Sequence, residues 1–335
     1  MRKLAILPAL CLAFWAAPSI AQTLDADTAP AQAEAPAAEQ ILVVGQKPGP
    51  GMWKVSKGDH VLWIFGDYGP LPVKMQWRSH EVEAVVARSQ EYLAPPVANA
   101  SVGILRGALL LPSLIGINKL PDGATLRDVL PADVYARWQP MKEKYLPKDD
   151  ERERPVFTAG RLFDAALFKA GLTTRTGVRK QIETIVHDRK LKVTSSSFEL
   201  PMDNARKMIK DFKKAPLEDA ACLSSTVARL ETDVDAMRLR ANAWAKGDIA
   251  GIRKLDFVDQ EESCRDVIMN SAAVRNDPAF QSVRPRLQAM WVANAENALA
   301  RNASSFALLP VREILDPKGM VAALAAKGYT VEQPE

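Results

Sequence analysis

The side chains that most often perform acid–base or metal chemistry are sparse in this sequence. The 335-residue chain contains three histidines, His60, His80 and His187. No two of them have the spacing of a zinc-binding pair, and the His-Glu-x-x-His pattern is absent. A histidine near the end of a predicted helix, such as His187, ordinarily interacts with the helix dipole. The histidines therefore do not by themselves indicate a catalytic or metal site.

The serine, glycine and tryptophan patterns give no stronger indication. Ser195, Ser196 and Ser197 lack the Gly-x-Ser-x-Gly turn that exposes a serine nucleophile, so a serine hydrolase is not predicted. A phosphate-binding glycine loop and a dinucleotide fingerprint are also missing. The three tryptophans at 53, 63 and 77 could stack on sugar rings beside a cleft, although large aromatic side chains more often belong to the core.

The charge balance excludes one large class of partners. The chain has 44 Lys and Arg residues against 40 Asp and Glu residues, a formal net charge of +4. Because this excess is small and is not gathered into a basic run, nucleic acid is not a predicted partner.

The first residues have the order of a secretory signal. Residues 1–3 are cationic, 4–17 are apolar, and Ser19-Ile20-Ala21 offers a small-residue cleavage site, which predicts a signal peptide over 1–21. The apolar run is about 14 residues, whereas a membrane-spanning helix needs about 20, so cleavage is favoured over a membrane anchor. Lipidation of Cys11 is disfavoured because a bulky leucine precedes it.

The remaining chain is predicted to work outside the cytoplasm. Residues 22–40 are rich in Ala and Pro with almost no large apolar side chains, which predicts a disordered linker before a folded domain at 41–335. Cleavage leaves two cysteines, Cys222 and Cys264, and in an oxidising compartment such a pair predicts one disulfide. The expected location is periplasmic or secreted, in a bacterium.

The apolar and polar periodicity predicts an α+β domain, rich in helices. Strands are expected near both ends of the domain, so the N-terminal and C-terminal strands are expected to share one mixed sheet. The patterns predict strands at 41–44, 52–55, 61–65, 191–196, 306–309 and 329–332, and helices at 79–91, 126–130, 132–145, 157–170, 178–188, 285–302 and 318–327.

Two further segments carry separate expectations. The most apolar stretch after the signal, 102–117, is too short and too broken to cross a bilayer and is predicted to lie in the core, so no transmembrane segment is expected in the mature chain. A heptad-like seam from Leu223 to Trp244 predicts one long helix beginning near 216. A return helix at about 260–274 would complete a long helical hairpin joined by the disulfide.

A series of short motifs in order resembles a known family. They are Gly51-Met52-Trp53-Lys54-Val55, Leu62-Trp63-Ile64-Phe65-Gly66, Leu71-Pro72, Trp77, the helix at 82–87, Leu120-Pro121-Asp122-Gly123-Ala124-Thr125-Leu126, Ala170-Gly171-Leu172, Arg301-Asn302 and Gly328-Tyr329. Together they resemble the TraB/GumN family, which is related to the Tiki proteases. The resemblance implies a metal-dependent peptide hydrolase with two Gly-x-x-His motifs, each after a strand.

The sequence departs from the resemblance where that chemistry should lie. The first motif position has the sequence Gly66-Asp67-Tyr68-Gly69 and the second has Pro310-Val311-Arg312-Glu313, so both histidines are replaced. An oxygen-only site for a divalent metal such as manganese would need Asp67, Glu313 and Glu83. If no such metal site exists, no cofactor is expected. The residues expected to form a binding site are Gly66, Asp67, Tyr68, Trp63, Trp77, Arg312 and Glu313.

Three hypotheses follow for the function. The first is a non-catalytic family member that acts as a binding or accessory module in the cell envelope, with an envelope protein, peptide or polysaccharide as its partner. The second is a metal-dependent peptide hydrolase with a nonstandard carboxylate site. The third is a structural protein that uses the helical hairpin as an interaction arm.

Overall fold

The computed structural model describes residues 49–214, 219–254, 264, 272–275 and 277–334. The predicted signal peptide, linker and strand at 41–44 lie outside the described residues, as does most of the predicted return helix at 260–274.

The described chain contains strands of two to eight residues and helices of up to 19 residues. The strands are β1 (Met52–Lys57), β2 (His60–Asp67), β3 (Leu71–Pro72), β4 (Glu91–Leu93), β5 (Val97–Ser101), β6 (Leu172–Thr173), β7 (Lys192–Thr194), β8 (Ser197–Pro201), β9 (Ser304–Pro310) and β10 (Thr330–Glu332). The helices are α1 (His80–Arg88), α2 (Ile104–Leu114), the 3-10 helix η1 (Pro121–Gly123), α3 (Leu126–Val129), α4 (Ala132–Tyr145), α5 (Pro155–Lys169), α6 (Val178–Asp188), α7 (Ala205–Lys214), α8 (Ala220–Thr232), α9 (Val234–Ala245), α10 (Ile249–Lys254), α12 (Ala272–Arg275), α13 (Pro278–Gln281), α14 (Val283–Arg301), α15 (Val311–Leu315) and α16 (Met320–Ala326).

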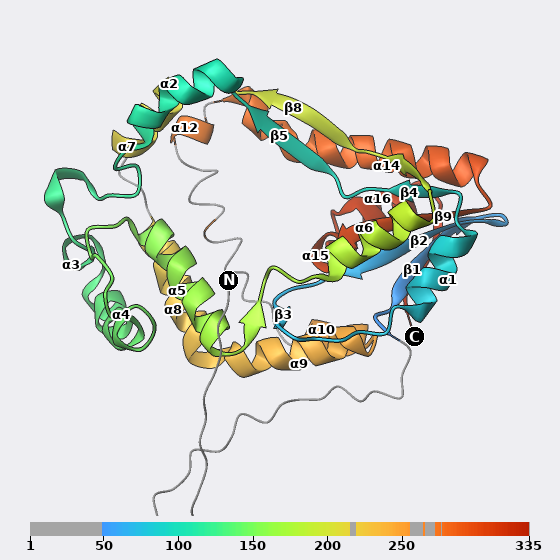
Figure 1. Ribbon diagram of the computed structural model, residues 1–335, viewed down its shortest axis with the longest axis horizontal. Coiled ribbons are helices and arrows are strands. Elements are labelled where there is room, and N and C mark those ends of the chain that lie inside the picture. The colour runs from blue at the N-terminus through green and yellow to red at the C-terminus, as the bar shows by residue number, and fades with distance from the viewer. Residues whose placement is uncertain (1–48, 215–218, 255–263, 265–271, 276, 335) are drawn as a thin grey trace, which may run out of the picture. The chain divides into compact units, whose positions relative to one another are not determined.

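Six strands form one mixed sheet in the order β10-β1-β2-β9-β4-β7. Figure 1 labels four of them, β1, β2, β9 and β4. β1 and β2 form an antiparallel hairpin, and β10 adds to the outer side of β1, also antiparallel. β9 lies between β2 and β4 and is parallel to both, and β7 is parallel to β4. The prediction of a mixed sheet built from N-terminal and C-terminal strands in a helix-rich domain is confirmed.

Burial in the sheet follows the position of each strand. β1 alternates, with Trp53 and Val55 buried, as expected of a strand with one covered face. The central β9 buries every residue from Ser305 to Leu309, because helices including α1, α14 and α15 pack against it. The continuous apolar run in the sequence therefore marks the middle of the sheet.

A second core lies between helices α4, α5 and α8. Trp138, Leu162 and Leu223 are fully buried there. Cys222 belongs to the same core and forms a disulfide with Cys264, so the predicted pairing is confirmed.

Two expectations about the helices are wrong. The predicted single helix to Trp244 is divided into α8 and α9 at Asp233, whose backbone leaves the helical region at φ −118° and ψ 0°. The apolar segment 102–117 is not in the core: it forms α2, and Leu111 and Ile115 are 63% and 77% exposed. Hydrophobic composition predicted burial, but the fold places α2 where only part of its surface has a protein neighbour.

In the part of the chain that the structure describes, no helix has the length and apolarity needed to span a membrane.

A buried carboxylate joins two strands, β4 and β7, and the end of α14. Glu91, at the start of β4, is 2% exposed. It accepts hydrogen bonds from Thr194, from Asn302 at 2.7 Å and from Lys192 at 3.1 Å, and Arg301 lies 3.6 Å away. Burial acts to raise the pKa of Glu91, but these hydrogen bonds outweigh it and lower the pKa.

This pKa direction predicts an acid-sensitive contribution to stability. A carboxyl whose pKa is lower in the folded state stabilises the fold above its unfolded pKa, about 4.3 for Glu, and loses that effect as the pH falls through the folded pKa. We expect Glu91→Gln to lower the free energy of unfolding by about 1.5–3 kcal/mol at neutral pH. Denaturant titrations across this pH range measure both effects. An unchanged pH slope in the variant would assign the acid sensitivity to other groups.

Candidate functional site

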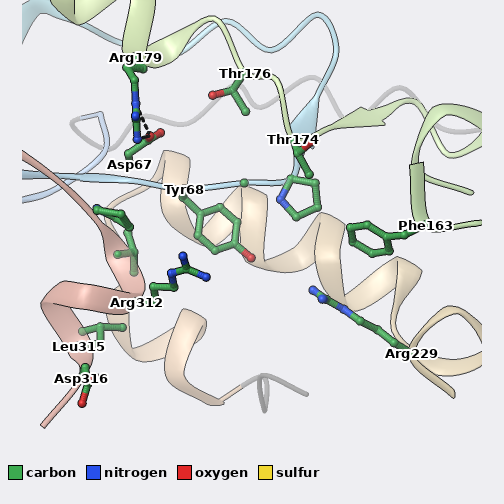
Figure 2. A pocket seen from close by; sticks show the side chains of 14 residues that line it. Asp67, Tyr68, Phe163, Thr174, Thr176, Arg179, Arg229, Arg312, Leu315 and Asp316 are labelled. Atoms are coloured by element: carbon green, nitrogen blue, oxygen red, sulfur yellow. Dashed lines mark hydrogen bonds and ion pairs between the residues drawn. The ribbon is translucent and has the colours of Figure 1, made fainter. Parts of the chain in front are cut away.

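The carboxyl ends of β2 and β9 meet at one edge of the sheet. The strands are parallel, and Asp67 at the end of β2 lies opposite Pro310 at the end of β9. Ligand sites of open α/β sheets commonly lie at such strand ends, because the loops that follow diverge there. A pocket of about 580 Å³ opens at this position (Figure 2).

Five parts of the chain line this pocket, which we call the strand-end pocket. Its lining residues are Asp67, Tyr68, Gly69, Pro70, Phe163, Thr174, Thr176, Arg179, Arg229, Pro310, Val311, Arg312, Leu315 and Asp316. They come from the end of β2 and the segment after it, from α5, from the segment between β6 and α6 with the start of α6, from α8, and from the end of β9 with α15 and the residue after it.

Arginines dominate the ionic character of the strand-end pocket. Arg179 from α6, Arg229 from α8 and Arg312 from α15 reach it from separate elements (Figure 2). The lining residues include these three arginines and two aspartates, Asp67 and Asp316. Guanidinium groups that reach one pocket from three separate elements favour an anionic ligand.

Arg229 is held in place from behind by Asp233. The carboxylate of Asp233 accepts a hydrogen bond from Arg229 Nε at 3.4 Å and also pairs with Arg240, whose side chain is fully buried. The Arg229 guanidinium lies 5.1 Å from the centroid of the Phe163 ring. Burial lowers the pKa of Arg229, and the charge of Asp233 opposes that shift. The break between α8 and α9 therefore places the shared carboxylate behind the pocket.

Tyr68 contributes a neutral phenol to the pocket. Burial raises the pKa of Tyr68 to about 12, although the charges of Arg240 and Arg229 partly oppose the shift. Its hydroxyl is therefore protonated at physiological pH. A protonated phenol can donate a hydrogen bond to an anion.

The structure brings some of the predicted binding residues together and separates others. Asp67, Tyr68 and Arg312 line the strand-end pocket, while Gly66 and Glu313 are not among its lining residues. Trp63 and Trp77 also lie elsewhere. They pack against the main core, Trp63 beneath the guanidinium of Arg88 and Trp77 beside Phe65 and Trp244, as does the fully buried Trp53. The three tryptophans therefore do not form a cleft beside the pocket.

Two of the three carboxylates considered for a metal site, Asp67 and Glu83, are engaged in other contacts, and the third, Glu313, does not line the pocket. Asp67 pairs with Arg179 at 3.0 Å, and Glu83 accepts a hydrogen bond from Ser79 at 2.5 Å. Within the described residues, no group of three or more His, Cys, Asp or Glu side chains is arranged to hold a metal ion. The donor set at the strand-end pocket does not fit the divalent metal that the resemblance implies.

The three histidines lie away from the strand-end pocket. His60 contacts the carbonyl of Leu299 at 2.6 Å, and His187 lies at an exposed helix end beside Asp188. None of the three lines the pocket.

Sequence patterns did not point to the other pocket residues. Phe163, Thr174, Thr176, Arg179 and Arg229 all follow Asp67 by about 100 residues or more and belong to no shared motif. Arg229 lies outside the apolar seam of the predicted long helix. Only the folding of α8 against α5 and the sheet brings them together.

A match to a protein-family model includes all the residues of the strand-end pocket. The model of the TraB/PrgY/gumN family matches residues 51–333, which include every residue of the strand-end pocket. The chain belongs to the TraB/PrgY/gumN family. Searches of curated proteins and of solved structures found no match. The strand-end pocket is therefore formed by the region that defines family membership.

The glycine at the end of β2 is required by packing in this TraB/PrgY/gumN chain. A Cβ atom at Gly66 would lie 2.7 Å from Val311 Cγ2 and 2.8 Å from Trp53 Cζ3, closer than side chains pack. Its carbonyl also accepts a hydrogen bond from Trp244 Nε1 at 2.7 Å. The absence of a side chain at Gly66 therefore lets α15 approach the sheet beside the pocket.

Gly66→Ala is expected to lower the free energy of unfolding by about 1–3 kcal/mol, because the added methyl group overpacks the contact between β2 and α15. Gly58→Ala is unsuitable as a control because Gly58 has a positive φ, whereas Gly160→Ala meets nothing within 4 Å and gives a matched comparison. Thermal and denaturant unfolding measure the difference. Equal stability of Gly66→Ala and Gly160→Ala would contradict the packing argument.

Proposed function

We propose that this TraB/PrgY/gumN protein is an exported, non-catalytic binding or accessory module of the bacterial cell envelope. Its ligand site is the strand-end pocket, and its ligand is a carboxylate-bearing envelope peptide or polysaccharide. The observation that carries the proposal is the chemistry of the pocket lining, in which arginine side chains and a neutral tyrosine surround the ends of two parallel strands.

Arginine suits recognition of a carboxylate. The guanidinium group is planar and presents paired N–H donors that match the two carboxylate oxygens. Arg312 on α15 and Arg179 on α6 are exposed, while Arg229 is buried and pairs with Asp233. The proposed complex places the ligand carboxylate between Arg312 and Arg229, within reach of the Tyr68 hydroxyl.

The same lining supports a non-catalytic role. Hydrolysis by the mechanism that the family resemblance implies needs imidazole or carboxylate ligands for a metal that activates water. At the two motif positions this chain has Gly-Asp-Tyr-Gly at 66–69 and Pro-Val-Arg-Glu at 310–313. The one carboxylate that these segments supply to the pocket, Asp67, is paired with Arg179.

Export is proposed from the sequence at 1–21 and from the disulfide. The cationic, apolar and small-residue order of the first residues is typical of a secretory signal. The Cys222–Cys264 bond is the kind that persists in an oxidising compartment such as the periplasm. The proposed location is therefore periplasmic or secreted.

Binding of defined carboxylates tests the proposal. Peptides with a free C-terminal carboxylate and uronic-acid oligosaccharides are titrated calorimetrically, with amidated peptides and neutral oligosaccharides as controls. We expect Arg312→Gln to weaken carboxylate binding about tenfold or more, because a charge-assisted hydrogen bond is lost. Arg127→Gln, an exposed arginine outside the pocket, is the matched control.

Metal content and peptide hydrolysis are measured on the same preparations. Equal affinity for carboxylate and amide forms, or equal binding by Arg312→Gln and the unsubstituted protein, would refute the assigned ligand class. Metal-stimulated peptide hydrolysis that is lost in Asp67→Ala would refute the non-catalytic role.

A further inference from the structure

Helix α2 presents large apolar side chains to solvent. Leu109, Leu111 and Ile115 are 65%, 63% and 77% exposed, and Leu114 is also exposed. Among the residues of α2 whose burial the structure describes, 107–114, Gly107, Leu110 and Ser113 are half-buried. Four large apolar side chains grouped on one short helix and its C-cap exceed the scattered exposure that is normal for a soluble surface.

A strongly basic helix lies against α2. Five of the ten residues of α7 are Lys or Arg, and one is acidic. The guanidinium of Arg206 donates to the Leu109 carbonyl at 3.3 Å, and the ammonium of Lys213 donates to the Ile115 carbonyl at 2.5 Å. Helical spacing places Lys210 between these two residues on the same side of α7. Cationic groups therefore border the exposed leucines directly.

The strand topology explains why the two helices meet. β5 and β8 are parallel neighbours, with Ser101 opposite Pro201, and α2 and α7 follow them after a few residues each. Both helices consequently begin at the same end of the two-stranded ribbon. Figure 1 shows α2 and α7 together with α12 at that end, away from the six-stranded sheet. The fold thus carries an apolar and basic tip separate from the strand-end pocket.

We propose that the tip formed by α2 and α7 docks on the surface of an anionic lipid bilayer. The exposed leucine and isoleucine side chains of α2 would be buried in the acyl-chain region just below the lipid headgroups. The neighbouring lysines and arginine of α7 would contact the anionic headgroups themselves, so a bilayer interface accommodates both kinds of side chain. The 11 residues of α2 span about 16 Å, shorter than the hydrocarbon core of about 30 Å, so the helix lies in the interface and does not cross it.

The chemistry of the tip favours a bilayer over another occupant. A second copy of this chain would bring the α7 cations of the two copies close together, and like charges repel. An anionic lipid surface instead has complementary charge over its whole area. Its attraction falls with salt, because the charges are exposed and screened.

Flotation with lipid vesicles tests the proposal. The full chain is mixed with phosphatidylglycerol–phosphatidylcholine vesicles or with phosphatidylcholine vesicles alone, and the bound fraction is measured at low and high salt. Leu111→Ser with Ile115→Ser is expected to weaken binding to the anionic vesicles at least about tenfold. Lys210→Glu with Lys214→Glu is expected to weaken it at least about fivefold.

Matched controls place equal changes elsewhere on the surface. Phe168→Ser removes another large apolar side chain, 82% exposed, and Lys74→Glu with Lys148→Glu changes two exposed lysines. These variants are expected to bind like the unsubstituted protein. Because all variants share the same N-terminal segment, their differences report on the substituted surfaces.

A second measurement locates the contact. Quenching of tryptophan fluorescence by brominated lipid is expected to increase in Leu111→Trp and not in Phe168→Trp. No vesicle binding at low salt, or equal binding by the α2 variants and their controls without a gain of quenching at position 111, would overturn the proposal. Self-association that Leu111→Ser abolishes, without vesicle binding, would assign the tip to a second copy and would also overturn it.

Discussion

Asp233→Ala is expected to lower the free energy of unfolding by about 3–5 kcal/mol. Asp233 neutralises Arg240, which is fully buried, and Arg229, which is 7% exposed. Removing the carboxylate takes away the counter-charge that these two buried cations share, and loss of a counter-charge is costly for a buried ion. Urea unfolding followed by circular dichroism measures the loss.

A neighbouring aspartate provides the control for this substitution. Asp235 pairs with Arg238 at 3.0 Å on the surface, with its own side chain 90% exposed, and an exposed ion pair contributes little. Asp235→Ala is therefore expected to cost less than about 1 kcal/mol. Similar losses for Asp233→Ala and Asp235→Ala would contradict the view that a shared buried carboxylate supports the strand-end pocket.

Asp233 also connects stability to the proposed ligand site. In a variant that retains the fold, Arg229 loses the partner that positions it beside Phe163. Arg312 lies on a different element, so Arg229 and Arg312 would no longer be held at the separation that lets both bind one carboxylate. The proposed ligand should therefore bind more weakly to Asp233→Ala than to Asp235→Ala.

Replacing both disulfide cysteines is expected to have a comparable effect. Cys222→Ser with Cys264→Ser opens a loop with a sequence separation of 42 residues, and the chain-entropy model gives about 4 kcal/mol for closing such a loop. Cys222 also lies in the core between α4, α5 and α8, where a serine hydroxyl needs a hydrogen-bond partner. The double variant should therefore unfold at a clearly lower denaturant concentration.

Reductant separates the loss of the bond from the loss of packing. Reduction of the unsubstituted protein breaks the bond but keeps both sulfur atoms, so it reports the effect of the cross-link, and the double serine variant should not respond to reductant. If reduction left the unfolding midpoint unchanged, the cross-link would contribute nothing and the whole effect would belong to the core substitution.

The local patterns of the sequence were sufficient for much of the sheet. The apolar runs at 52–55 and 61–65 predicted the two strands that form the β1–β2 hairpin, and the apolar run at 306–309 predicted the strand that became β9. The Cys222–Cys264 pairing needed only a count of the cysteines that remain after the predicted signal. The strands depend on residues close in sequence, and the disulfide has one possible pairing once two cysteines remain.

Hydrophobic periodicity was misleading where tertiary context decided the outcome. The seam from Leu223 to Trp244 continues across Asp233, yet the helix breaks there, where the Asp233 side chain pairs with Arg229 and Arg240. The apolar segment that became α2 has the composition of a core helix. Its exposure follows from its place after β5 at the end of the ribbon, which composition does not encode.

By itself, the sequence determined the helix-rich mixed fold, the hairpin, the disulfide and the absence of familiar catalytic motifs, because each depends on local spacing or residue counts. Only the tertiary structure decided which residues line the strand-end pocket. Asp67, Arg179, Arg229 and Arg312 come from four elements, and their common position depends on the parallel pairing of β2 with β9 and on the packing of α6 and α8 beside it. Side chains this distant in sequence share no periodicity, so their convergence could be found only once the chain was folded.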